Sequence, residues 1–154
     1  MIGTIPQELV YTFFESFARF ECAMKGSRFC RRGPHNRAEP DWVELADQLG
    51  SLLAAQQGQR LTQAMAYLLS KPPEVQMYRD GKAVFVATPL RGDNDGQRAL
   101  EALKRVRNNL FHGGKHTNHS PEERDRRLLG HALVVLEATV DLDLDLSSVY
   151  RGRY

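Results

Sequence analysis

The segment QRALEALKRVRNNLFHGG, residues 97–114, decides the fold of this chain. Its apolar residues recur at steps of three and four, and at about 100° per residue they share one continuous face of a helix. These residues are Leu100, Leu103, Val106, Leu110 and Phe111. The consecutive glycines at 113 and 114 favour the end of a helix. The spacing therefore predicts a helix over about 97–111 with one buried face.

A charged residue interrupts the apolar face of that helix. Arg107 falls inside the apolar arc, so we expect it to be paired, to face a groove or to lie in a subunit interface. Glu21 lies in the same way on the phenylalanine-rich face of another predicted helix, over 6–25, and is the natural counter-ion. Two interpretations stay open. The pair is a structural ion pair, or Glu21 holds Arg107 beside a reactive site.

Helical periodicity extends over most of the chain. A helix is predicted after Asp41, which is a favoured N-cap residue, and another over about 59–70. A last helix is predicted after Ser120 and Pro121, because they supply an N-cap and a proline at the first helical position.

The remaining segments complete the predicted fold. Asp80-Gly81 lies between β-prone runs and predicts a β-hairpin over about 74–88. The basic segment 28–39 contains Gly-Pro and is expected to be a loop. We therefore predict an all-α fold, a bundle of about five helices with one small β-hairpin. It forms a single domain over 1–154, with its core in about 6–141 and a loose C-terminal tail over about 146–154.

Composition excludes several classes of protein. The chain has 154 residues and a formal net charge of +2, with 42% apolar and 26% charged residues, which argues against wholesale disorder. It has no apolar run long enough for a transmembrane helix and no secretory signal pattern at its start. The spacing of Cys22 and Cys30 matches neither a disulfide framework nor a zinc site. We expect two reduced thiols, a cytoplasmic protein and no membrane partner.

Charge is unevenly distributed along the chain. Basic residues gather in two acid-free stretches, 25–37 and 104–119, whereas acids gather over 137–145. This pattern fits a local anion-binding face, although basic residues that merely solvate loops would give the same pattern. The candidate phosphate contacts are Arg28, Arg31, Arg32, Lys104, Arg105, Lys115 and His116.

His112 lies at the predicted end of the helix, directly before the two glycines. Asn108 precedes it by one turn, so its amide can orient the imidazole. The histidines at 112, 116 and 119 have spacings that a helix could use for a metal ion. The glycines and Pro121 argue that this stretch is not helical, so we expect neither a metal nor a cofactor.

The motif Arg107-Asn108-Asn109-Leu110-Phe111-His112, followed by Gly113-Gly114-Lys115, resembles the signature of HEPN domains, which are small helical proteins. In that family an arginine, often followed by a polar residue, precedes a histidine by four to six residues at the end of a late helix. The first predicted helix, with its acid at Glu21, also resembles HEPN first helices. The resemblance covers about residues 6–141, with the hairpin as an insertion.

This resemblance implies a metal-independent endoribonuclease, a toxin or phage-defence effector. It implies that RNA is the substrate, that a homodimer forms across the face of Arg107 and His112, and that an antitoxin or other regulatory protein is a further partner. It implies that Arg107 and His112 are catalytic, supported by Asn108 and Glu21, and that RNA is cleaved through the 2′-OH to a 2′,3′-cyclic phosphate. Some toxins of the family carry a modified tyrosine two residues after the histidine, where this chain has Gly114. The alternatives are an inert HEPN-like module that binds nucleotides or RNA, and a helical protein-interaction module.

Overall fold

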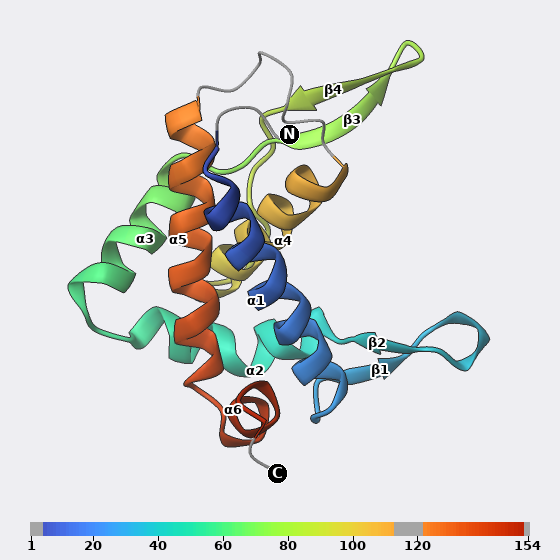
Figure 1. Cartoon of the computed structure of the whole chain (residues 1–154), viewed down its shortest axis with the longest axis vertical. Helices are drawn as coiled ribbons and strands as arrows, with labels where there is room; N and C mark the ends of the chain where they lie inside the picture. The colour runs from blue at the N-terminus through green and yellow to red at the C-terminus, as the bar shows by residue number, and fades with distance from the viewer. Residues whose placement is uncertain (1–4, 113–121, 153–154) are drawn as a thin grey trace.

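The computed structural model describes residues 5–112 and 122–152, without the side chains of His112 and Glu122. Within these ranges the chain forms six α-helices and two two-stranded antiparallel sheets (Figure 1). The helices are α1 (Gln7–Lys25), α2 (Trp42–Ala55), α3 (Gln59–Ser70), α4 (Asp95–His112), α5 (Glu122–Val140) and α6 (Leu144–Tyr150). The strands are β1 (Cys30–Arg32), β2 (Ala38–Pro40), β3 (Val75–Arg79) and β4 (Lys82–Val86). The prediction of a mainly helical chain is confirmed.

Side-chain caps explain where two of the helices begin. The carboxylate of Asp41 accepts a hydrogen bond of 3.1 Å from the backbone N–H of Glu44, so the predicted start of α2 is confirmed. The side-chain oxygen of Asn94 accepts one of 2.9 Å from the backbone N–H of Gln97, and α4 begins two residues earlier than its apolar period indicates. Ser120 and Pro121, expected to start α5, lie outside the described residues.

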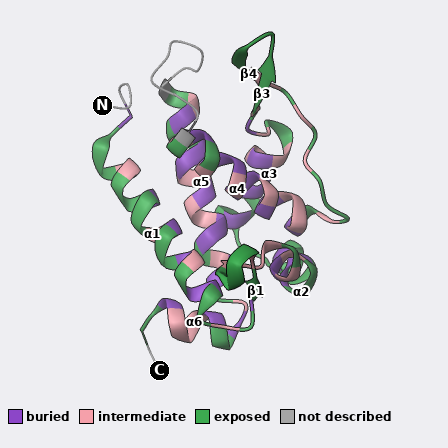
Figure 2. Cartoon of the chain, turned by 90° about the vertical axis from the view of Figure 1, so that its right-hand side faces the viewer, coloured by how far each residue is buried: buried purple, intermediate pink, exposed green. Residues whose placement is uncertain are grey.

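The hydrophobic core lies around α5, which packs against α1, α3 and α4. The buried residues of each helix face inward, as the purple bands of Figure 2 show. Burial of a large apolar side chain contributes about 1.5–3 kcal/mol, so these residues dominate the stability of the fold. The largest of them are Phe13, Phe17, Phe20, Met24, Phe29, Leu45, Leu49, Leu53, Leu68, Leu100, Leu103 and Leu136.

Two glycines allow α2 and α4 to approach each other so closely that their backbones are in contact. A Cβ atom added to Gly96, in the first turn of α4, would lie 1.6 Å from the carbonyl oxygen of Gly50 in α2. No side chain fits there, because the obstructing atoms are backbone and cannot rotate away.

Two β-hairpins project from the helical body. The β3–β4 hairpin pairs Val75 with Val86 and Arg79 with Lys82, which confirms the hairpin predicted at Asp80-Gly81. The β1–β2 hairpin pairs Cys30 with Pro40.

The prediction of a loop over 28–39 is therefore wrong. The turn of the β1–β2 hairpin places His35 at φ 58° and Asn36 at φ 63°, without a glycine at either position. The usual sequence signal of a hairpin is an Asn-Gly or Asp-Gly pair, and this turn lacks it.

The predicted loose tail over 146–154 is also wrong as far as the structure describes it, to residue 152. The carboxylate of Asp143 accepts a hydrogen bond of 2.9 Å from the backbone N–H of Leu146 and caps α6. Leu146 is fully buried, and the Tyr150 hydroxyl donates to Glu137 of α5 at 3.2 Å. Burial, with the neighbouring Glu137 carboxylate, raises the pKa of Tyr150. Short as it is, α6 is anchored to the core.

Candidate functional site

Arg107 and Glu21 form an ion pair between α4 and α1. Nη2 of Arg107 lies 3.4 Å from each carboxylate oxygen of Glu21. The prediction that these residues neutralise each other is confirmed. Their side chains are 24% and 22% exposed, so the pair lies at the edge of the core and within reach of solvent. The 3.4 Å contacts are longer than the usual 2.7–2.9 Å of a charge-assisted hydrogen bond.

Trp42 fixes the position of Glu21, and sequence analysis did not place it in the site. Its indole N–H donates a hydrogen bond of 2.8 Å to Oε2 of Glu21. Its ring stacks on Phe17 at 5.7 Å and lies 5.6 Å from Phe20. The sequence offered one signal, a tryptophan directly after the N-cap Asp41. Because the indole N–H usually has a partner when it is buried, a nearby acceptor was to be expected.

Aromatic rings surround the two cations of the site. The guanidinium carbon of Arg107 lies 5.1 Å from the ring centre of Phe17 and 5.9 Å from that of Phe111. The ammonium of Lys104, one turn earlier on α4, lies 5.7 Å from the ring centre of Trp42. All three distances fall within the range of cation–π attraction, which holds these cations without neutralising them.

Arg107 retains unused donors. A guanidinium carries five N–H groups, and its hydrogen bonds in the described part of the chain all come from Nη2. Its Nε also lacks a hydrogen-bond partner among the described atoms, but it is buried and out of reach of a ligand, so Nη1 is the donor group left for one. A planar fork with free donors is suited to binding a phosphate group.

An apolar patch borders the ion pair. The rings of Phe14 and Phe111 lie 5.2 Å apart, although their side chains are 53% and 39% exposed. Tyr11, one turn before Phe14 on α1, is 66% exposed. Exposed aromatic side chains that gather in this way are typical of an interaction surface.

The structure places only part of the predicted motif. His112 is the last residue of α4, and its side chain lies outside the described residues, as do Lys115 and His116. Asn108 is exposed and lines a pocket of about 330 Å³ with Glu74 and Gln76. It therefore lies on the face of α4 toward β3, and among the described residues no hydrogen bond joins its side chain to that of Arg107.

Arg105 is a structural residue, which corrects its prediction as a phosphate contact. It is 6% exposed, and its guanidinium donates to the carbonyl oxygens of Pro73 at 3.3 Å, Thr88 at 2.6 Å and Pro89 at 2.7 Å. Burial lowers the pKa of Arg105, and the nearby Glu101 carboxylate partly offsets this effect. The side chain thus joins α4 to both ends of the β3–β4 hairpin.

Replacing Arg105 by alanine is expected to lower the free energy of unfolding by about 3 kcal/mol, because three carbonyls of the hairpin base lose their donor. Arg105→Lys should recover part of this loss, since an ammonium can reach one or two of the carbonyls. Urea denaturation followed by circular dichroism measures both variants. A loss below about 0.5 kcal/mol for Arg105→Ala would contradict this role.

The arginines at the base and in the strand of the first hairpin differ in their partners. Arg28 pairs with Asp143 at 2.5 Å and donates to Gln48 at 2.8 Å, so it ties the hairpin base to α6 and α2. Arg31 lies 3.5 Å from Glu39 across the hairpin. Arg32 has no acidic partner among the described residues. None of these arginines contacts the Arg107–Glu21 pair.

The described residues contain no cluster of His, Cys, Asp or Glu side chains suited to a metal ion, and the histidines at 116 and 119 fall outside them. Within 5–112 and 122–152, no helix has the length and apolarity that crossing a membrane requires. Comparison with protein families, with curated proteins and with solved structures gives no match to this chain.

Proposed function

We propose that this protein is a metal-independent endoribonuclease of HEPN type. The observation that carries the proposal is the geometry of Arg107 at the end of α4. Glu21 holds Arg107, Trp42 fixes Glu21, and Nη1 of the arginine has no hydrogen-bond partner in the described part of the chain and is left for a phosphate. His112 ends the same helix five residues later, which is the order of residues in the HEPN motif.

The proposed reaction is an attack of the ribose 2′-oxygen on the adjacent phosphorus atom. His112 accepts the 2′-OH proton or donates a proton to the departing 5′-oxygen, and its ordinary pKa near 6.5 suits either task. The new P–O2′ bond replaces the P–O5′ bond, which gives a 2′,3′-cyclic phosphate and a 5′-hydroxyl. Arg107 neutralises the charge that develops on the non-bridging phosphate oxygens.

Glu21 is a positioning residue in this proposal. An arginine with a long, flexible side chain loses conformational freedom when it binds a phosphate. The ion pair with Glu21 limits that freedom before RNA arrives, and the indole of Trp42 limits the freedom of Glu21. Nη1, which has no hydrogen-bond partner in the described part of the chain, then binds the phosphate while Nη2 stays on Glu21.

Incubation of the purified protein with total RNA in the presence of EDTA tests this proposal directly. Expected are fragments with 2′,3′-cyclic phosphate and 5′-hydroxyl ends, formed at an undiminished rate in the chelator. Fragments that carry 5′-phosphates, or cleavage that a divalent ion must restore, would refute it.

The homodimer is proposed to form across the apolar patch of Tyr11, Phe14 and Phe111, beside Arg107. Phe14→Glu should weaken this dimer by at least about 2 kcal/mol, because the buried ring is lost and a charge is introduced. Analytical ultracentrifugation at micromolar concentration should show a dimer for the unaltered chain and a monomer for the variant.

Leu144→Glu is the matched control for the dimer. Leu144 lies on α6 and is 88% exposed, so the same change of charge there should leave the dimer intact. An unaltered chain that sediments as a strict monomer would contradict a composite site between two subunits.

A second candidate function is an inert module that binds nucleotides or RNA. The free Nη1 donors of Arg107 favour it as well, since they bind a phosphate whether or not His112 transfers a proton. Measurement of RNA binding and RNA cleavage on one preparation separates the two functions.

A further inference from the structure

The two β-hairpins project from the same side of the helical body, one near each end (Figure 1). In the perpendicular view of Figure 2, β1 and the β3–β4 pair both lie toward the viewer, well separated from each other. We refer to residues 30–40 as the lower arm and residues 75–86 as the upper arm. In Figure 1 the C-terminal end of α4 lies close beneath the upper arm, and the lower arm leaves the body further down.

Side-chain contacts join the bases of both arms to the last turns of α4. Asn109 donates a hydrogen bond of 2.8 Å to the carbonyl oxygen of Glu74, directly before β3. Arg107 pairs with Glu21, which accepts from Trp42, two residues after the end of β2. The Arg107 site therefore lies between the two arms.

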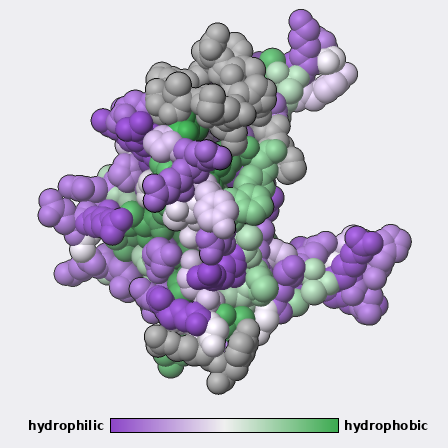
Figure 3. Space-filling model, viewed as in Figure 1, coloured by the Kyte–Doolittle hydropathy of each residue, from purple (hydrophilic) through white to green (hydrophobic). Residues whose placement is uncertain are grey.

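The lower arm is a basic ribbon with little contact to the core. It carries Arg31, Arg32 and Arg37 against one acid, Glu39, and each of the three arginines is exposed. Arg32 and Arg37 have no ion-pair partner in the described part of the chain. Figure 3 shows a largely hydrophilic arm that extends into solvent. A two-stranded ribbon so poorly covered adds little to stability, and its charges suit a polyanion.

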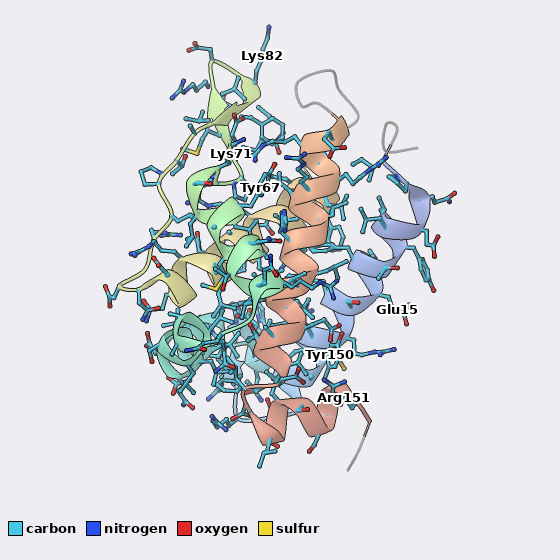
Figure 4. All side chains as sticks on the ribbon, turned by 90° about the vertical axis from the view of Figure 1, so that its left-hand side faces the viewer. Glu15, Tyr67, Lys71, Lys82, Tyr150 and Arg151 are labelled. Atoms are coloured by element: carbon cyan, nitrogen blue, oxygen red, sulfur yellow. The ribbon has the colours of Figure 1, made fainter. Side chains whose placement is uncertain are left out.

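The upper arm combines an exposed aromatic ring with two cations. Tyr78 is 82% exposed, and its partner across the strands is Ala83, which is too small to cover the ring. Arg79 and Lys82 form the next pair, at the tip, and Figure 4 shows Lys82 pointing away from the body. Because successive pairs face opposite sides of a ribbon, these two cations lie on the other face from Tyr78, near enough to attract a polyanion to the tip. An open aromatic ring is a surface on which proteins stack the bases of single strands.

We propose that the two arms hold single-stranded RNA across the Arg107 site. The lower arm binds the phosphates through Arg32 and Arg37, and the upper arm stacks an unpaired base on Tyr78. The single-stranded class follows from Tyr78, because the bases of a duplex are stacked on each other and hidden from such a ring. This inference rests on the proposed function, from which it takes RNA as the ligand. It requires that the protein bind RNA, but not that it cleave RNA.

Binding of a fluorescent 2′-O-methyl oligouridine of about 20 nucleotides, longer than the site of one stacking platform, tests the proposal. The methyl group removes the nucleophile, so binding is measured without cleavage. Fluorescence anisotropy over a salt titration gives the dissociation constant and the number of phosphates neutralised.

The double variant Arg32→Ser/Arg37→Ser should bind about tenfold more weakly. Its plot of log binding constant against log salt should be flatter by about 1.4, because two phosphate contacts are lost. Arg60→Ser removes one positive charge and is the matched control for the single variant Arg32→Ser, which should bind more weakly than the control. Arg60 is exposed in the first turn of α3, has no ion-pair partner among the described residues and lies away from both arms.

Tyr78→Ala should bind at least about fivefold more weakly, whereas Tyr78→Phe should bind like the unaltered chain, since stacking needs the ring and not the hydroxyl. Circular dichroism should show unchanged folding, because these side chains are exposed. Equal affinity of all arm variants would overturn the proposal. Tighter binding of a matched RNA duplex, or no binding of the oligouridine, would do so as well.

These outcomes are distinguishable from failure of the proposed function. A protein that binds the oligouridine through both arms but leaves ordinary RNA intact supports the arms and refutes the nuclease. A protein that cleaves RNA with arm variants as active and as tightly bound as the unaltered chain supports the nuclease and refutes the arms.

Discussion

An alanine at position 96 is expected to lower the free energy of unfolding by about 3 kcal/mol or more, at the upper end of the cost of overpacking a core. The added methyl group would lie 1.6 Å from the Gly50 carbonyl oxygen and 2.5 Å from its carbon. Since these are backbone atoms, α2 and α4 must separate to make room. Such a separation opens gaps around Leu45 and Leu100, which are buried on the two helices.

Gly130→Ala provides the matched control for this change. Gly130 lies inside α5, where an added Cβ would meet nothing within 4 Å. Alanine there should stabilise the protein by about 0.5–1 kcal/mol, because glycine is a poor helix former. Urea denaturation of both variants gives the comparison. Similar stabilities for the two would show that the helices do not approach at Gly96.

Sequence periodicity anticipated the helices because each buries one apolar face. The step of three and four residues in α1, α2 and α4 leaves little choice of structure. The Arg107–Glu21 pair followed from the same reasoning, since a charge on an apolar face requires a partner nearby. The hairpin turn at Asp80-Gly81 could also be predicted from the sequence, because this dipeptide accepts the positive φ that the turn requires.

The features that sequence analysis missed depend on contacts between distant segments. Arg105 looked like a surface cation, but carbonyls of residues 73, 88 and 89 surround it. Gly96 lies just before the predicted start of the helix at about residue 97, and only the approach of α2 shows why it has no side chain. The lower arm has no glycine in the left-handed part of its turn, so its strands carried no local signal. The surroundings of these residues are set by tertiary packing between distant segments, which the local sequence pattern does not predict.

Replacement of His112 by alanine is expected to slow RNA cleavage about 100-fold or more, because proton transfer to or from the ribose is lost. Binding of the uncleavable 2′-O-methyl RNA should change little, since Arg107 and both arms are retained. Single-turnover cleavage, with protein in excess over RNA, measures the chemical step without product release.

Arg107→Ala should differ from His112→Ala in its effect on RNA binding. Cleavage should fall by a similar factor, but binding should weaken too, and the salt dependence should flatten by about 0.7 because one phosphate contact is lost. Arg107→Lys should restore part of the binding and little of the cleavage, since an ammonium lacks the planar fork. Glu21→Gln keeps an acceptor for the Trp42 indole and releases Arg107, so cleavage should fall more than binding.

The difference between the two single variants decides between a nuclease and a binding module. In a nuclease His112 transfers a proton and Arg107 neutralises charge on the phosphate. The loss of either residue therefore slows cleavage, but only the loss of Arg107 weakens RNA binding. In a binding module Arg107→Ala weakens binding, and the unaltered chain leaves RNA intact at every pH from about 6 to 9, the range in which a histidine can serve as base or acid. Cleavage that survives in His112→Ala at the unaltered rate would remove the histidine from the reaction and, with it, the HEPN mechanism.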